Sequence, residues 1–243
     1  MENNEIKRRK VMIGTPCYDG KLEAYYVNSL INTIKMSYEK NVDILSIWVS
    51  YDALVQRARN DTVAIALELG CDDLIFIDAD IEWDPSWFFK LLDYNEDVVG
   101  GIYPKKTDIQ EEYPVYNESQ NWQPQSNGLI EVSGLGTGFL KLSKNALQYL
   151  WDNNEEYFDQ SRPEVLKKMI FNVNIRNKFL VSEDISACLQ LKQGGFKIWL
   201  DPSMTCAHIG NKKYVSNFSD YLQRLLNINT NIPPPNFDDD TII

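Results

Sequence analysis

The first hundred residues alternate between two hydrophobic periods, and this alternation limits the possible folds more than any other feature of the chain. Four short apolar runs have the length and composition of buried strands: 11–15, 42–49, 74–77 and 98–102. Between them, apolar residues recur at helical spacing over three segments: 21–38, 53–69 and the stretch that follows Asp84. Strands that alternate with helices are joined by right-handed crossovers. We therefore predict an α/β fold with a mostly parallel central sheet flanked by helices.

The second half of the chain is less regular, and its elements are predicted one by one. A glycine-rich turn lies between two predicted strands, at 129–132 and 138–142, and Ser143 is expected to cap a helix that ends near Trp151. A polar, aromatic insert covers 152–178. A helix over 182–193 and a strand over 196–200 follow. We predict one domain over residues 1–230 and a mobile Pro-rich and acidic tail over 231–243.

Charge and hydropathy exclude several classes of protein. The chain has 24 Lys and Arg against 35 Asp and Glu, a net charge of −11, which argues against a duplex nucleic-acid partner. No transmembrane segment is expected, because the longest stretch without a charged residue spans 13 residues and contains three prolines. The basic residues at 7–10 precede too few apolar residues for an export signal. The four cysteines are widely spaced, so we expect a cytoplasmic, intracellular and soluble protein with reduced thiols.

The strongest chemical signal is the sequence Asp78-Ala79-Asp80 directly after the apolar run 74–77. Ligands of open α/β sheets bind outside the carboxyl ends of the strands, where these two carboxylates are expected to lie. Carboxylate oxygens suit Mg²⁺ or Mn²⁺ shared with a substrate phosphate. In a chain of charge −11, such a cation would also separate the carboxylates from a diphosphate. The alternative is a solvated acidic turn without a ligand.

This arrangement resembles the nucleotide-sugar-dependent glycosyltransferases of the GT-A fold. Further segments resemble motifs of that family in the same order along the chain: 14–18 after the first strand, 58–60 before the Asp-x-Asp strand, 134–139, 182–184 and 208–210. The resemblance covers about residues 10–215 and is closest to small viral and bacterial members, including the chlorovirus-type transferases. It implies a Rossmann-like GT-A domain, and for a viral member the host cytoplasm is the expected compartment.

The resemblance also implies roles for single residues. Asp80 and His208 would bind the metal, and Asp78 would bind the metal or the donor ribose. Because imidazole suits Mn²⁺ better than Mg²⁺, a histidine ligand favours manganese, whereas the alternative is an ordinary, partly buried histidine. For Arg57 the alternative is a surface ion pair with Asp61. The residues expected to contact the nucleotide or the donor sugar are Thr15, Pro16, Tyr18, Arg57, Arg59, Asn60, Asp78, Ala79, Gly136 and Lys212.

Asp184 is the predicted catalytic base. A carboxylate beside the acceptor hydroxyl can take its proton during attack, which would invert the anomeric configuration. The alternative is that Glu183 and Asp184 only cap a helix N-terminus. The predicted function is metal-dependent transfer of a hexosyl or deoxyhexosyl group from a nucleoside-diphosphate sugar, with UDP favoured, to a hydroxyl of a glycan or another acceptor.

Two other functions compete with this interpretation. A nucleotidyltransferase that makes nucleotide-sugars should carry a Gly-rich loop with Arg or Lys after the first strand, but residues 15–19 read Thr-Pro-Cys-Tyr-Asp. A carbohydrate-binding module would need no nucleotide.

Overall fold

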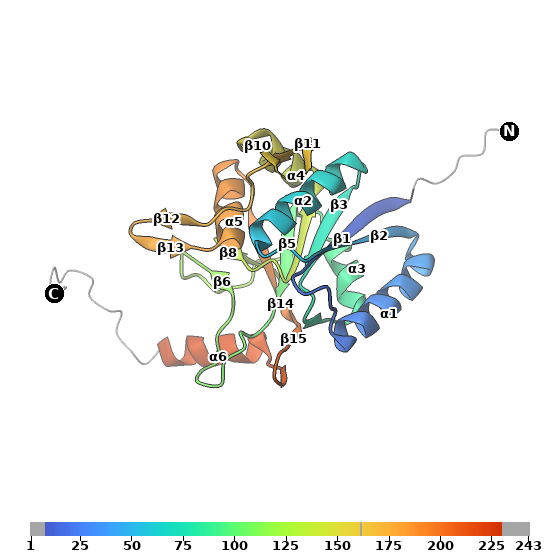
Figure 1. Cartoon of the computed structure of the whole chain (residues 1–243). Coiled ribbons are helices and arrows are strands. Elements are labelled where there is room, and N and C mark those ends of the chain that lie inside the picture. Colours follow the sequence, from blue (N-terminus) through green and yellow to red (C-terminus); the bar gives the residue numbers. More distant parts are fainter. Residues whose placement is uncertain (1–7, 161, 230–243) are drawn as a thin grey trace.

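The computed structural model describes residues 8–160 and 162–229, so the predicted tail over 231–243 lies outside the described residues. A seven-stranded sheet forms the centre of the fold (Figure 1). Its strands follow one another across the sheet in this order: β2 (Val42–Ser50), β1 (Arg9–Cys17), β3 (Asp73–Ile77), β9 (Phe139–Ser143), β5 (Val98–Ile102), β14 (Ile198–Thr205) and β7 (Ile130–Val132).

The sheet is mixed, with most of its strands running in one direction. β1 pairs in parallel with β2 and β3, and β14 pairs in parallel with β5. β9 lies antiparallel between β3 and β5, and β7 is antiparallel to β14 at the edge. Since β9 is antiparallel to both neighbours, β5 runs in the same direction as β3. The predicted α/β fold with a mostly parallel sheet is confirmed.

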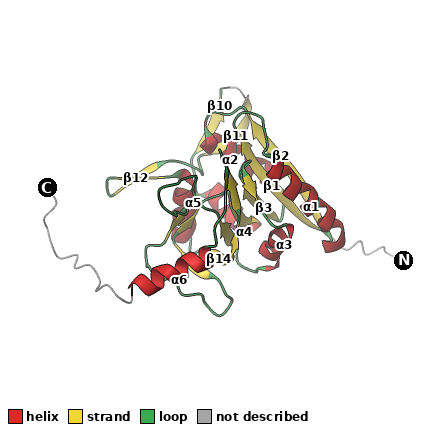
Figure 2. Cartoon of the chain, turned by 90° about the horizontal axis from the view of Figure 1, so that it is seen from below, coloured by secondary structure: helices red, strands yellow, loops and turns green. Residues whose placement is uncertain are grey.

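Helices cover both faces of the sheet, and the alternation of side chains along each strand separates two cores. Met12, Leu74 and Phe76 face one core, whereas Val11, Ile13 and Ile75 face the other. The first core is covered by α2 (Val55–Glu68), α4 (Lys144–Asp152), α5 (Glu183–Gln193) and α6 (Phe218–Asn229). The second is covered by α1 (Ala24–Lys40) and α3 (Pro85–Asp93), which lie next to each other on one side of the sheet, at the right of Figure 2.

Helix starts follow the capping signals of the sequence. The Asp84 side chain accepts a hydrogen bond from the Ser86 amide at the start of α3, and Ser143 does the same for the Ala146 amide at the start of α4. α5 begins at Glu183, as predicted. α6 was not predicted, although Phe218, Tyr221, Leu222 and Leu225 have helical spacing.

Short strands complete the fold around the central sheet. β4 (Ile81–Glu82), β15 (Ala207–Ile209) and β16 (Lys213–Tyr214) form one small sheet, and β6 (Val115–Tyr116) pairs with β8 (Gly134–Leu135). The insert predicted over 152–178 contains the hairpin of β10 (Glu156–Asp159) with β11 (Arg162–Lys168). It also contains β12 (Asn174–Arg176), which pairs with β13 (Phe179–Val181) just after the insert. Among the described residues, no helix is long and apolar enough to cross a membrane.

Candidate active site

Asp78 and Asp80 lie at the carboxyl end of β3, in the middle of the sheet. The neighbouring strand β1 is parallel, with Gly14 beside Phe76, so Thr15 and Pro16 continue toward the same edge. Thr15 is fully buried, and its hydroxyl lies 2.6 Å from the Tyr26 hydroxyl on α1. The strand order therefore brings the predicted nucleotide-contacting segment next to the two carboxylates.

His208 faces Asp80 from β15. The antiparallel pairing of β15 with β4 sets His208 opposite Ile81, and the Ile209 amide donates to the Asp80 carbonyl at 2.8 Å. The His208 Nδ1 donates a hydrogen bond to the Pro104 carbonyl at 2.8 Å. In the neutral ring this leaves the Nε2 lone pair free, and Nε2 lies 3.5 Å from Asp80 Oδ1. A backbone carbonyl that fixes the tautomer in this way is typical of histidines that bind metals.

The other carboxylate oxygen of Asp80, Oδ2, forms an ion pair with the ammonium group of Lys106. Burial alone would raise the pKa of Asp80, but hydrogen bonds from Lys106 and from the protonated form of His208 outweigh it and hold this pKa below its usual range. The carboxylate is therefore stabilised in its charged form.

These residues fit a divalent cation in part. Within residues 8–160 and 162–229, no group of three or more His, Cys, Asp or Glu side chains is placed to hold a metal ion. Two donors, Asp80 Oδ1 and His208 Nε2, do converge. A cation shared with a diphosphate needs few protein ligands, because phosphate and water oxygens complete its shell. The donor set therefore suits a cation that binds together with a diphosphate.

Arg59 joins three elements through a buried ion-pair network. Its side chain is only 6% exposed, and Nη2 lies 3.2 Å from Asp78 Oδ1 at the end of β3. Nη1 forms an ion pair with Glu183 at the start of α5. Burial raises the pKa of Asp78, and the nearby charge of Asp80 adds to this, so Arg59 offsets the rise only in part. Arg59 thereby holds α2, β3 and α5 together around the predicted site.

Asp184 follows Glu183 at the N-terminus of α5. Its Oδ1 accepts hydrogen bonds from the Ser182 hydroxyl and, at 2.7 Å, from the Ile185 amide. These contacts show that Asp184 takes part in the local structure of the helix start, as the capping alternative requires. They engage one carboxylate oxygen, and Asp184 is close enough to contribute electrostatically at Asp78 and Arg59. The charge of Asp184 thus acts on the same two residues as the charges of the Asp78–Arg59–Glu183 network.

Tyr103 contacts both His208 and the glycine-rich turn. Its ring packs edge-on against the His208 ring, with centroids 5.2 Å apart, and its hydroxyl accepts from the Gly138 amide at 3.1 Å. Burial and the charges of Asp78 and Asp184 raise the pKa of Tyr103 well above its usual value. A Cβ atom on Gly138 would lie 2.5 Å from this ring, and one on Gly136 would lie 2.6 Å from its hydroxyl. The glycine-rich turn therefore makes room for Tyr103, and Gly136 lies buried behind it.

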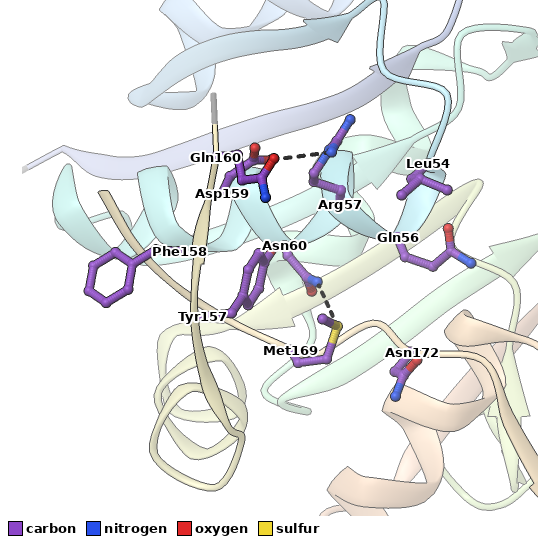
Figure 3. A pocket seen from close by; sticks show the side chains of 10 residues that line it. All are labelled: Leu54, Gln56, Arg57, Asn60, Tyr157, Phe158, Asp159, Gln160, Met169 and Asn172. Carbon is purple, nitrogen blue, oxygen red and sulfur yellow. Dashed lines mark hydrogen bonds and ion pairs between the residues drawn. The ribbon is translucent and has the colours of Figure 1, made fainter. Parts of the chain in front are cut away.

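Arg57 and Asn60 lie about one turn apart on α2. Both line a cavity of about 460 Å³ between α2 and the β10–β11 hairpin (Figure 3). Arg57 pairs with Asp52 at 2.7 Å and with Asp159 at 3.3 Å, rather than forming the Asp61 ion pair considered as an alternative. The Asn60 Oδ1 accepts from the Phe171 amide at 2.8 Å, a contact between α2 and the segment after β11. Their donor roles stay predictions.

The other predicted contact residues follow three different strands, β1, β3 and β15. Tyr18 is exposed, and the Ala79 carbonyl accepts from the Glu23 amide at 3.0 Å. Lys212 pairs with Asp108 and lies over the Tyr214 ring, 5.0 Å from its centroid. It lines a hollow of about 660 Å³ that also includes Pro104, the partner of His208.

Two residues of the site were not predicted as functional: Lys106 and Glu183. Lys106 lies 26 positions from Asp80, and Glu183 lies 124 positions from Arg59. No local pattern marks such contacts. The only available signal was Glu183 itself, next to the predicted base at a helix start.

Comparisons with known proteins show the fold. No family model matches the chain, and no curated protein matches it. The crystal structure of A197 from STIV aligns with 84% of this chain and 86% of that chain, with a TM-score of 0.52 and 19% sequence identity. A structure described as a putative glucose-1-phosphate thymidylyltransferase from Bacillus anthracis, in complex with a sucrose, covers 95% of this chain and 98% of its own. Its TM-score of 0.37 and identity of 10% are too low to support an argument. The first likeness supports the mixed α/β fold and says nothing of the reaction.

Proposed function

We propose that the chain is a metal-dependent glycosyltransferase that moves a sugar from a nucleoside-diphosphate sugar to an acceptor hydroxyl. The observation that carries this proposal is the convergence of Asp80 Oδ1 and His208 Nε2, 3.5 Å apart, at the carboxyl end of β3. The Pro104 carbonyl orients the ring for this role, and Arg59 holds Asp78 beside it. A solvated acidic turn would need neither a fixed tautomer nor a buried arginine.

The nucleoside diphosphate would bind along the edge formed by β1 and β3, with Asp80 and His208 holding Mn²⁺ or Mg²⁺. When bound, the cation would neutralise charge on the departing diphosphate. Asp78, which pairs with Arg59, would accept a hydrogen bond from the donor ribose. UDP is the favoured nucleotide because of the resemblance noted above, and the donor sugar and acceptor stay open.

Asp184 would act as the base in the transfer step. Its carboxylate takes the proton of the acceptor hydroxyl while the oxygen forms a bond to the anomeric carbon. The bond from that carbon to the diphosphate oxygen breaks, and the diphosphate leaves with the electron pair. Attack opposite the leaving group inverts the configuration. Arg59 stays in place because its two carboxylate partners come from different elements.

Calorimetric titration of UDP into the protein with Mn²⁺, and then with EDTA, tests the donor site. We expect metal-dependent binding in the wild type, at least tenfold weaker binding in Asp80→Asn, and wild-type binding in Asp84→Asn. Asp84 is a matched control because asparagine also caps helices, and Asp84 caps α3 outside the site. No binding of UDP, GDP or CDP would overturn the proposal. Binding of a simple sugar without nucleotide would favour a carbohydrate-binding module.

The reaction type is tested with the products. Incubation with UDP-sugars should release UDP, whereas a nucleotidyltransferase would form a nucleotide-sugar and pyrophosphate from a nucleoside triphosphate and a sugar phosphate. Asp184→Asn should lower transfer by about 100-fold or more while UDP affinity stays within about twofold. Transfer at the wild-type rate in this variant would limit Asp184 to capping.

A further inference from the structure

The β12–β13 hairpin exposes more apolar surface than the short strands around it. Ile175, Phe179 and Leu180 are 77%, 76% and 76% exposed. Ile175 pairs with Leu180 across the hairpin, and Arg176 pairs with Phe179, so successive pairs point to opposite faces. Apolar side chains therefore reach solvent from both faces of the hairpin.

The hairpin is anchored at its base and closed by a tight turn at its tip. The Asn174 side chain donates to the Ser186 hydroxyl of α5 at 2.6 Å, and β13 leads directly into α5. At the other end, Asn177 and Lys178 have φ values of 49° and 67°, which closes a tight turn. The two strands pair only with each other in the described structure, and they project beyond α5 in Figure 1. An isolated two-stranded hairpin is marginal in water unless something covers it.

The β10–β11 hairpin, by contrast, is covered by a helix. β11 packs against α2, and its Lys167 is buried in an ion pair with Asp61 at 2.6 Å. Among the described residues, no helix covers the tip of the β12–β13 hairpin in this way. Beside it lies a hollow of about 450 Å³, lined by Leu180 together with Ile185 and Leu189 of α5. The exposed apolar surface thus continues from the hairpin toward α5.

The β12–β13 hairpin, over residues 174–181, carries Arg176 and Lys178 and no acidic residue. Residues 165–182 contain four basic residues and no Asp or Glu, in a chain whose net charge is −11. Lys167 and Lys168 are bound in ion pairs with Asp61 and Glu156. Arg176 and Lys178 lie at the tip, where Arg176 is 3.8 Å from Glu118. Basic side chains near an anionic lipid surface each contribute about 1 kcal/mol to binding, and exposed apolar neighbours add the burial of their own surface.

We propose that the β12–β13 hairpin docks this protein on a membrane with anionic headgroups. Ile175, Phe179 and Leu180 enter the boundary between headgroups and acyl chains, and Arg176 and Lys178 remain among the phosphates. Exposure on both faces favours a fluid lipid layer, which can surround a hairpin, over a flat protein surface, which covers one face. A second copy docked through the same hairpin would bring the basic tips together.

Flotation of the full chain with lipid vesicles, without nucleotide or metal, tests the proposal separately from the transferase function. We expect binding to vesicles that contain about 30% anionic lipid, weaker binding to neutral phosphatidylcholine, and a decrease with rising salt. Phe179→Ser with Leu180→Ser should reduce partition by at least about tenfold. Ile109→Ser, at a side chain 94% exposed in another loop, is the matched control and should leave partition unchanged.

The electrostatic part has its own pair of variants. Arg176→Gln with Lys178→Gln should weaken binding to anionic vesicles by roughly 30-fold, at about fivefold per charge. Lys35→Gln with Lys40→Gln, on the exposed side of α1, makes the same change of charge elsewhere. Equal effects of the two double variants would overturn a specific role of the hairpin tip.

Two further results would overturn the proposal. One is the absence of wild-type binding to anionic vesicles. The other is a concentration-dependent dimer in light scattering that Phe179→Ser with Leu180→Ser abolishes, since a second copy would then cover the hairpin. Phe179→Trp should support docking through quenching of its fluorescence by brominated acyl chains, relative to Ile109→Trp.

Discussion

Removal of the Arg59 charge should destabilise the protein far more than removal of the same charge two residues earlier. Arg59→Met keeps a chain of similar length but leaves Asp78 and Glu183 without their shared cation. Their side chains are 26% and 14% exposed, so water replaces the arginine only in part. Breaking one side of a buried ion pair costs about 3–5 kcal/mol. Because Asp78 is partly solvated, we expect about 3 kcal/mol, a large share of a typical stability of about 5–15 kcal/mol.

Urea unfolding at pH 8 measures this cost, and Arg57→Met is the control. Arg57 lies on the same helix as Arg59 and pairs with Asp52 and Asp159, but its side chain is 38% exposed, so its loss should cost about 1 kcal/mol or less. Adding Glu183→Gln to Arg59→Met should restore part of the stability, because the amide needs no counter-ion. If Arg59→Met lowers the free energy of unfolding no more than Arg57→Met does, Arg59 does not hold α2, β3 and α5 together.

The same pair of proteins should respond to pH in a defined direction. Burial raises the pKa of Asp78, so its carboxyl becomes protonated at a higher pH than an ordinary aspartate. A neutral Asp78 gains little from Arg59. The difference in unfolding free energy between wild type and Arg59→Met should therefore shrink as the pH falls from 8 toward 5. A difference that grows on acidification would contradict this account.

Three other expectations concern single side chains. Burial lowers the pKa of Lys141 to about 8 from 10.5, so the unfolded chain binds more protons than the folded one between these pH values. In urea unfolding, the destabilisation caused by this buried charge should therefore decrease as the pH rises from 8 to 10.5. Lys141→Met should therefore be more stable than wild type at pH 7, and a gap that stays constant up to pH 10.5 would be the wrong result. Lys106→Met should bind Mn²⁺ about fivefold more tightly, because a partly exposed ion pair of about 1 kcal/mol no longer competes for Asp80. Mn²⁺ paramagnetic resonance checks this against Lys105→Met, which frees only Glu112, and equal affinities would exclude competition. Gly138→Ala should cost about 1–3 kcal/mol in thermal unfolding, since its methyl group would overlap the Tyr103 ring, and an unchanged melting temperature would show that this ring can move.

Local patterns were enough to predict most of the elements that carry the site. The apolar run that ends at Ile77 is a buried strand, and the caps at Asp84 and Ser143 start helices where their side chains predict them. The last predicted strand, 196–200, instead spans Ile198–Thr205 and is followed by β15 and β16. α6 carried a readable helical pattern, but it lies beyond the segment of family resemblance.

The amino-acid sequence by itself determined that Asp78 and Asp80 follow a buried strand in an α/β fold, because hydrophobic period and capping act over a few residues. Only the tertiary structure decided that Lys106 and His208 share Asp80, and that Arg59 joins Asp78 to Glu183. It also decided that Tyr103 fills the space left by Gly136 and Gly138. Such contacts depend on which strands become neighbours, and β9 lies between β3 and β5 through pairing over long stretches of chain. That pairing is set by the packing of the whole core, which no short segment of sequence specifies.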